Sequence, residues 1–304
     1  MDSVRRPAEG PARPPESPTR PPEVPIRWLD TLWLQISGTI CNLRCTHCFI
    51  SCAPDNHSHA MMTLEDVRRH VADAVRLGVR EYYFTGGEPF MHRDLLTMIE
   101  ETLRAGPVTV LTNGLFLAEE TCAALARLAD AAAYSLDIRV SLDGWGAEDH
   151  DAIRGPGTFR RAVEGIQRLH AGGVNPVITV TEAAEGVAAG EGRRRFLDLL
   201  RDWGLERPRF KILPLWRIGA EAKRTAGYGP DDRLSEESVT PEGLENLQCA
   251  GGRMATSRGV YVCPLLIEEP EARMGDRLDE TLRPFPLGFG ACVTCYVSGV
   301  TCRT

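Results

Sequence analysis

The feature that most constrains the fold is a regular alternation, from about residue 32 to about residue 213, of short β-rich runs with longer amphipathic segments. The β-rich runs predict strands over residues 32–37, 82–85, 108–112, 137–142, 176–181 and 210–213. The amphipathic segments predict helices over residues 63–77, 93–105, 118–132, 158–171 and 192–203. One strand and one helix every ~30 residues is typical of βαβ crossovers and a parallel sheet. We therefore expect an α/β fold, either a doubly wound sheet or a barrel with fewer than eight units.

The segments on either side of this alternation have a different character. Residues 1–27 are rich in proline, arginine and glutamate, which predicts a disordered or polyproline-like tail that buries no core. Residues 28–215 carry the alternation. Residues 216–304 contain shorter apolar runs and half of the ten cysteines, so we expect a small second domain held together partly by metal.

Composition excludes several classes of protein. Lys and Arg total 35 against 42 for Asp and Glu, a net charge of −7, which argues against a surface built to bind nucleic acid. No apolar run approaches the ~20 residues of a membrane span, and the N-terminus has no hydrophobic signal core. We therefore expect a cytoplasmic protein.

The cysteines fall into two groups. Cys122 stands alone on a predicted helix and is expected to be a core residue. The first group is Cys41, Cys45, Cys48 and Cys52, and the second is Cys249, Cys263, Cys292, Cys295 and Cys302. Because the cytosol keeps thiols reduced, two such groups indicate metal or iron–sulfur ligation rather than disulfides.

The first group follows the first predicted strand, with three and then two residues between Cys41, Cys45 and Cys48. Three thiolates can hold three irons of a cubane and leave the fourth iron open to an amine and a carboxylate. A zinc site with Cys52 or His47 as fourth ligand is the alternative. A packed loop cysteine is the simplest reading of Cys52.

Three further motifs follow the next strands. They are Thr85-Gly86-Gly87-Glu88-Pro89 after the second strand, Thr112-Asn113-Gly114 after the third, and Ser141-Leu142-Asp143-Gly144 with His150-Asp151-Ala152-Ile153-Arg154-Gly155 after the fourth. The glycines allow close backbone approach to a ligand, and the fork of a guanidinium suits a carboxylate. Taken singly, the first two motifs could be plain turns and Arg154 could form a loop salt bridge.

Together, these motifs and the aromatic Phe49 after Cys48 resemble the radical S-adenosylmethionine (SAM) superfamily over residues 30–215. The resemblance implies a partial (β/α)6 barrel. It also implies a [4Fe-4S] cluster held by Cys41, Cys45 and Cys48, with SAM at the open iron. One-electron reduction then releases a 5′-deoxyadenosyl radical, which abstracts a hydrogen atom from a substrate carbon.

The same resemblance implies the residues that bind SAM. Phe49 would pack near the adenine, and Gly86, Gly87, Glu88 and Pro89 would meet the amino group. Asn113 belongs to the Thr-Asn-Gly motif, and Ser141 and Arg154 would meet the carboxylate. An electron donor such as flavodoxin or ferredoxin is expected. The sequence identifies no catalytic base.

In the second group, Cys249 and Cys263 flank a predicted hairpin around Arg258-Gly259, and Cys292-x2-Cys295 and Cys302 follow. A closed four-thiolate zinc site is one interpretation. The layout also resembles the twitch domain, a shortened form of the SPASM domain. That resemblance implies one auxiliary [4Fe-4S] cluster on Cys249, Cys263, Cys292 and Cys295, with Cys302 as the alternate ligand.

The expected function is a radical SAM oxidoreductase-type enzyme. Its reaction would end as a net oxidation or bond formation on a small metabolite. A peptide-modifying maturase of the same superfamily is nearly as well supported. A non-enzymatic iron–sulfur or zinc scaffold is the alternative from another class, and its first cluster would be closed.

Overall fold

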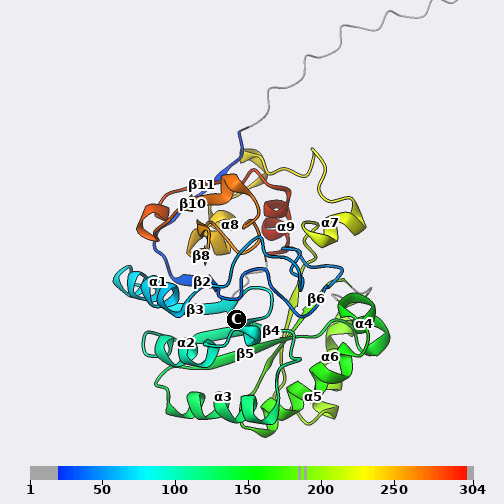
Figure 1. The fold of residues 1–304 in the computed structure, drawn as a ribbon. Coiled ribbons are helices and arrows are strands. Elements are labelled where there is room, and N and C mark those ends of the chain that lie inside the picture. The colour runs from blue at the N-terminus through cyan, green and yellow to red at the C-terminus, as the bar shows by residue number, and fades with distance from the viewer. Residues whose placement is uncertain (1–19, 184–185, 188–189, 300–304) are drawn as a thin grey trace, which may run out of the picture.

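The computed structural model describes residues 20–183, 186–187 and 190–299. Its centre is one nine-stranded sheet with the order β10-β9-β8-β2-β3-β4-β5-β6-β7 (Figure 1). The parallel strands that carry the alternation are β2 (Thr31–Gln35), β3 (Glu81–Thr85), β4 (Val108–Thr112), β5 (Leu136–Ser141), β6 (Val177–Thr181) and β7 (Arg209–Leu213). Within the described residues β2 and β7 do not pair, so these strands form an open, partial barrel.

Helices connect the parallel strands. They are α1 (Leu64–Arg76), α2 (Leu95–Thr102), α3 (Glu119–Ala131), α4 (Ala147–Arg154), α5 (Thr158–Ala171) and α6 (Gly190–Asp202). The predicted α/β class with a mostly parallel sheet is therefore confirmed. Helix α4 was not predicted, because its eight residues follow a Gly-Trp-Gly turn and carry no long apolar stripe. No helix in the described ranges is long and apolar enough to cross a membrane.

The C-terminal elements are α7 (Ala220–Thr225), α8 (Pro241–Glu245), β8 (Gly252–Thr256), β9 (Gly259–Tyr261), β10 (Arg273–Gly275), β11 (Phe285–Pro286) and α9 (Gly290–Ser298). Strands β8, β9 and β10 extend the same sheet, while β11 pairs with residues 23–24 in a separate two-stranded sheet. Strand β8 pairs parallel with β2 and antiparallel with β9, which confirms the hairpin around Arg258. Figure 1 shows β10, β11, α8 and α9 gathered at one end of the molecule. The expected domain boundary at residue 216 stays a prediction.

The sheet separates two apolar cores, as expected for strands buried on both faces. Along β2, Leu32 and Leu34 pack with the helices, while Trp33 faces the other way. Trp33 stacks on Tyr83 with 4.2 Å between the ring centroids, in the core that the C-terminal elements complete. The second core therefore joins the barrel strands to the segment after β7.

The predicted disordered tail needs a correction at its C-terminal end. Residues 1–19 lie outside the described residues, but Glu23–Val24 (β1) pairs antiparallel with β11. Val24 is buried in the second core, and the Leu287 N–H donates to the Pro22 carbonyl at 2.8 Å. The chain before residue 27 is therefore ordered by the burial of Val24 and by the pairing of β1 with β11. Proline is tolerated there because β1 is an edge strand.

Two glycines bring the end of β3 against the loop that follows β2. The Gly87 N–H donates to the Gly38 carbonyl at 2.9 Å, and the Glu88 N–H donates to the Ile40 carbonyl at 3.1 Å. A Cβ atom on Gly87 would lie 2.0 Å from the Ile40 oxygen, so a side chain cannot fit there without moving the backbone. This contact fixes the chain immediately before Cys41.

We expect Gly87→Ala to lower the free energy of unfolding by about 1–3 kcal/mol, the usual cost of overpacking. Gly229→Ala is the matched control, because a Cβ atom there would meet only Asp232 Oδ2 at 3.8 Å. The control should stay within about 0.5 kcal/mol of wild type. Urea denaturation of the metal-free proteins measures both. Equal stability of the Gly87→Ala and wild-type proteins would contradict the close packing.

Candidate functional site

The first cysteine group and the strand-end motifs line one cavity at the carboxyl edge of the parallel strands. The cavity encloses roughly 1030 Å³ of empty space, part of it open to solvent. The predicted site residues that line it are Cys41, Cys45, Cys48, Phe49, Gly86, Gly87, Asn113, Ser141 and Arg154. The last residue of each strand from β3 to β7 also lines it, namely Thr85, Thr112, Ser141, Thr181 and Leu213. The carboxyl ends of parallel strands are where α/β barrels place their chemistry.

The cysteine loop is fixed from two sides. The Thr46 N–H donates to the Ile153 carbonyl of α4 at 2.9 Å, and the Ala220 N–H donates to the Cys48 carbonyl at 2.9 Å. Backbone bonds to two separate segments therefore hold the thiols of Cys45 and Cys48 at the cavity wall.

The three thiols differ in acidity. Burial raises the pKa of Cys41 to about 12 and that of Cys45 to about 11. A hydrogen bond from the Cys52 thiol lowers the pKa of Cys48 to about 6. Metal binding at this loop must therefore displace protons from Cys41 and Cys45.

Cys52 is buried and lines the same cavity. Its backbone N–H donates to the Cys48 sulfur at 3.2 Å. Within the described ranges, no group of three or more His, Cys, Asp or Glu side chains is arranged to hold a single metal ion.

Glu88 and Pro89 lie behind the cavity wall rather than on it, which differs from the expectation that Glu88 meets the SAM amino group. The Glu88 carboxylate is fully buried and accepts from the Phe90 N–H at 3.1 Å, from Thr112 Oγ1 at 2.7 Å and from the Asn113 N–H at 2.8 Å. Burial raises its pKa to about 7. Glu88 thus ties the Gly-Gly-Glu-Pro motif to the end of β4, while Gly86 and Gly87 face the cavity.

Asp143, whose role the sequence did not indicate, joins the loop after β5 to three other segments. Its Oδ2 lies 2.7 Å from His47 Nε2 and accepts from Arg154 Nε at 2.6 Å, and its Oδ1 accepts from the Thr181 N–H at 2.9 Å. Burial alone would raise the pKa of Asp143, but Arg154 and His47 outweigh it and hold that pKa well below its usual range. The salt bridge considered for Arg154 is present, and Arg154 also lines the cavity.

Arg139 is a second residue that the sequence analysis did not single out. Its side chain is 1% exposed, lines the cavity, and donates from Nε to Thr179 Oγ1 at 3.3 Å. It lies two residues before Ser141 in β5, and residues two apart share one face of a strand. The available signal was that Asp137, Arg139 and Ser141 alternate with apolar residues in this strand, which places Arg139 on the same face as Ser141.

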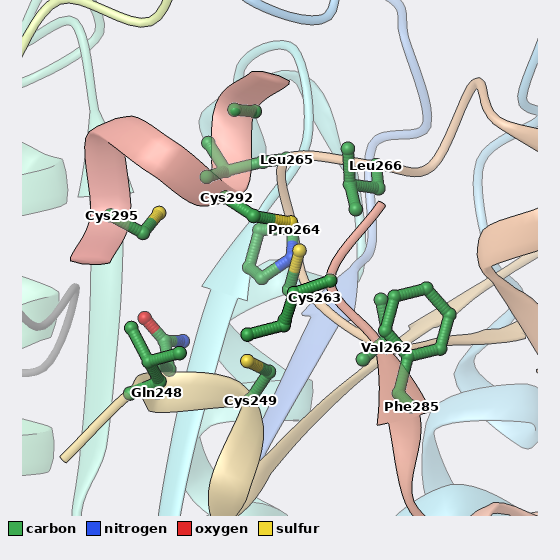
Figure 2. Close-up of a pocket in the computed structure, with 13 residues that line it drawn as sticks. Gln248, Cys249, Val262, Cys263, Pro264, Leu265, Leu266, Phe285, Cys292 and Cys295 are labelled. Atoms are coloured by element: carbon green, nitrogen blue, oxygen red, sulfur yellow. The ribbon is translucent and has the colours of Figure 1, made fainter. Parts of the chain in front are cut away.

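A second cavity holds four cysteines of the second group. Cys249 lies in a short 3-10 turn (η3, Gln248–Ala250), Cys263 follows β9, and Cys292 and Cys295 lie one turn apart on α9. Figure 2 shows these side chains around one space, with Val262, Leu265 and Phe285 beside them. Burial raises the pKa of Cys292 to about 11 and holds that of Cys263 well above its usual range. Cys302 lies outside the described residues.

Arg253 of β8 is buried beside this second cavity. Its guanidinium donates to the carbonyls of Cys249, Gly252, Thr281 and Arg283 at 2.7–3.4 Å. In the part of the chain that the structure describes, no carboxylate forms an ion pair with it. A buried charge needs a compensating charge, and Cys249 and Cys263 are the nearby groups that can become anionic.

Comparisons with a family model and with curated proteins agree on the family that this chain resembles. Residues 36–183 match the model of the Radical SAM superfamily. GTP 3′,8-cyclase of Pectobacterium atrosepticum is 32% identical over 230 residues, which cover 72% of this chain and 65% of that protein. Mycofactocin maturase MftC of Mycolicibacterium smegmatis is 31% identical over 150 residues, which cover 48% of this chain and 36% of that protein. The chain thus spans less than two thirds of the length of these curated relatives.

Solved structures show the same fold. Streptococcus suis SuiB bound to precursor peptide SuiA aligns with a TM-score of 0.63 at 14% identity, covering 88% of this chain and 71% of SuiB. Native anSMEcpe with bound AdoMet aligns with a TM-score of 0.60 at 16% identity, covering 83% of this chain and 79% of that protein. At these identities the likeness concerns the fold alone.

We expect Asp143→Asn to lower the free energy of unfolding by about 3–5 kcal/mol, because it leaves the buried Arg154 without its counter-charge. Asp202→Asn, at an exposed position, is the control and should cost at most about 0.5 kcal/mol.

The effect of Asp143→Asn should depend on pH. The folded-state pKa of Asp143 lies below the unfolded value, so its contribution is present above a pH of about 4 and is lost as the pH falls further. Urea titrations of the metal-free proteins at several pH values measure this. A stability difference that does not narrow in acid would contradict the assigned ion pairs.

Proposed function

Because this chain contains a radical SAM domain at residues 36–183, we propose that it cleaves SAM reductively and abstracts a hydrogen atom from a substrate carbon. The observation that carries the proposal is one cavity that gathers Cys41, Cys45 and Cys48 with the ends of five parallel strands. The family implies a [4Fe-4S] cluster and SAM as cofactors. Three thiols on one loop fit that cluster, because they leave a fourth iron open to SAM.

When bound there and reduced by one electron, SAM supplies a 5′-deoxyadenosyl radical. The chain's own residues would bind and orient SAM. Gly86 and Gly87 present backbone to the cavity without side chains, and Phe49 offers an aromatic face for the adenine. Ser141 and the terminal amino groups of Arg154 would hold the SAM carboxylate, while Arg154 Nε donates to Asp143.

Glu88 takes a positioning role in this proposal, because its carboxylate holds the ends of β3 and β4 together behind the cavity. Asn113 lies on the cavity side of that junction and donates from Nδ2 to Asn42 Oδ1 at 2.8 Å, next to Cys41. A small donor such as flavodoxin or ferredoxin would deliver the electron.

The direct test is anaerobic reconstitution followed by dithionite and SAM. We expect 5′-deoxyadenosine from the wild-type protein and none from Cys45→Ala, since a ligand of the cluster is lost. Cys122→Ala is the matched control, because Cys122 is buried in α3 and lines neither cavity. It should keep its activity. A wild-type protein with a full complement of iron and sulfide that cleaves no SAM would favour the non-enzymatic scaffold.

For the second cavity we propose an auxiliary [4Fe-4S] cluster on Cys249, Cys263, Cys292 and Cys295, in a twitch-like region that begins near residue 216. Arg253 supports an anionic centre there, because four thiolates around a metal centre supply the negative charge that its buried guanidinium lacks. Zinc in a four-thiolate site would carry negative charge as well, so iron and zinc analysis of the purified protein decides between the metals.

We expect Arg253→Met to destabilise the reconstituted protein by about 2 kcal/mol more than the metal-free protein, the Coulomb energy of two unit charges ~8 Å apart at an effective dielectric constant of about 20. The hydrogen bonds from Arg253 to backbone carbonyls are lost in both the reconstituted and the metal-free variant, so their contribution cancels in this comparison. Arg253→Lys keeps the charge and should show a smaller difference. Urea denaturation with and without reconstitution measures it. Equal losses in both forms would remove Arg253 as evidence for an anionic centre.

Two classes of substrate fit this proposal. A small molecule that undergoes net oxidation or bond formation is our first proposal, and the similarity to GTP 3′,8-cyclase favours it. A peptide substrate is the second, favoured by the similarity to mycofactocin maturase MftC and by the fold shared with SuiB bound to precursor peptide SuiA. Deuterium transfer from labelled candidates into 5′-deoxyadenosine separates the classes, and co-purification of a small precursor peptide would favour the second.

A further inference from the structure

The segment Trp216–Ala220 lies between the two cysteine sites. The Ala220 N–H donates to the Cys48 carbonyl, and a Cβ atom on Gly219 would lie 2.4 Å from the Phe49 oxygen. Gly219 has a φ of +61°, so both its conformation and its close approach require glycine. The segment is therefore packed directly against the first cysteine loop.

The same segment is bonded to helix α9, which carries two cysteines of the second site. The Arg217 N–H donates to the Tyr228 hydroxyl at 3.3 Å, and that hydroxyl lies 2.6 Å from Thr294 Oγ1. Thr294 lies between Cys292 and Cys295 on α9. The segment thus has fixed contacts on both sides.

Trp216 contacts both sites with one side chain. Its ring lines the first cavity and meets Phe49 edge-to-face, with 6.0 Å between the centroids. Its Nε1 donates to Cys295 Sγ at 3.3 Å. Trp216 is 3% exposed, so the indole N–H is buried and this hydrogen bond supplies it with a partner.

We propose that Trp216 is a positioning residue that couples the wall of the first cavity to the second cysteine centre and sets the reduction potential of that centre through its N–H bond to Cys295. This inference rests on the auxiliary cluster of the proposed function. Hydrogen bonds to a cluster sulfur stabilise its more negative, reduced state and so raise the reduction potential. Because the same ring is part of the cavity wall, a ligand that moves it changes that bond.

The test is a redox titration followed by electron paramagnetic resonance. It uses the full chain with Cys41, Cys45 and Cys48 replaced by alanine, so that only the second centre gives a signal. Trp216→Phe keeps an aromatic ring at the wall and removes the N–H. We expect it to shift the midpoint potential to a more negative value at unchanged iron content.

Trp33→Phe is the matched control in the same background. Trp33 is a buried tryptophan that lines neither cavity and stacks on Tyr83. If the loss of any buried indole had a general effect, the midpoint potentials of both variants would shift. We expect the potential of the control to equal that of the parent.

Two results would overturn the inference in distinguishable ways. If the wild-type chain binds about eight irons and Trp216→Phe titrates like the parent, the role of Trp216 is refuted and the auxiliary cluster stands. If the wild-type chain binds about four irons and the second site holds zinc, the auxiliary cluster and the role of Trp216 fall together.

Discussion

The first cavity depends on one buried carboxylate. Asp143 accepts from the Thr181 N–H at the end of β6 and from Arg154 of α4, and it lies within hydrogen-bonding distance of His47 in the cysteine loop. Each of these contacts orders a different part of the cavity wall. A single anion in a low-dielectric interior can hold a guanidinium and an imidazole strongly, because water does not screen them. The cysteine loop and Arg154 are therefore positioned by the same carboxylate.

The second constraint is the close packing of glycine-containing turns. Gly87 lets the turn after β3 lie against the Ile40 carbonyl, and Gly219 lets the segment after β7 lie against Phe49. Both contacts are made to the loop that carries the first cysteine group, one from the turn after β3 and the other from the segment after β7, the strand at the edge of the sheet. These backbone contacts thus hold the loop together with Asp143, and neither of them uses a thiol.

The two cysteine sites are connected through a shared sheet, a shared apolar core and a hydrogen bond. Strand β8 continues the sheet beyond β2, the second apolar core contains residues of both sites, and Trp216 bonds to Cys295 while lining the first cavity. Arg253 gives the second site a buried positive charge. The proposed auxiliary cluster would therefore keep a constant position relative to the first cavity, which suits the proposed net oxidation.

The sequence by itself determined the strands from residue 31 to residue 213, most of their helices and the cysteine loop, because periodicity and motif spacing are local properties. It also placed Gly86, Asn113 and Ser141 at strand ends that meet at one edge, and Arg154 in the segment that follows the fourth of these strands. Only the tertiary structure decided that Glu88 turns inward, that Asp143 joins His47 to Arg154, and that Trp216 reaches Cys295. These contacts join residues from 11 to 96 positions apart, and no local pattern records which distant partner a buried polar group will find.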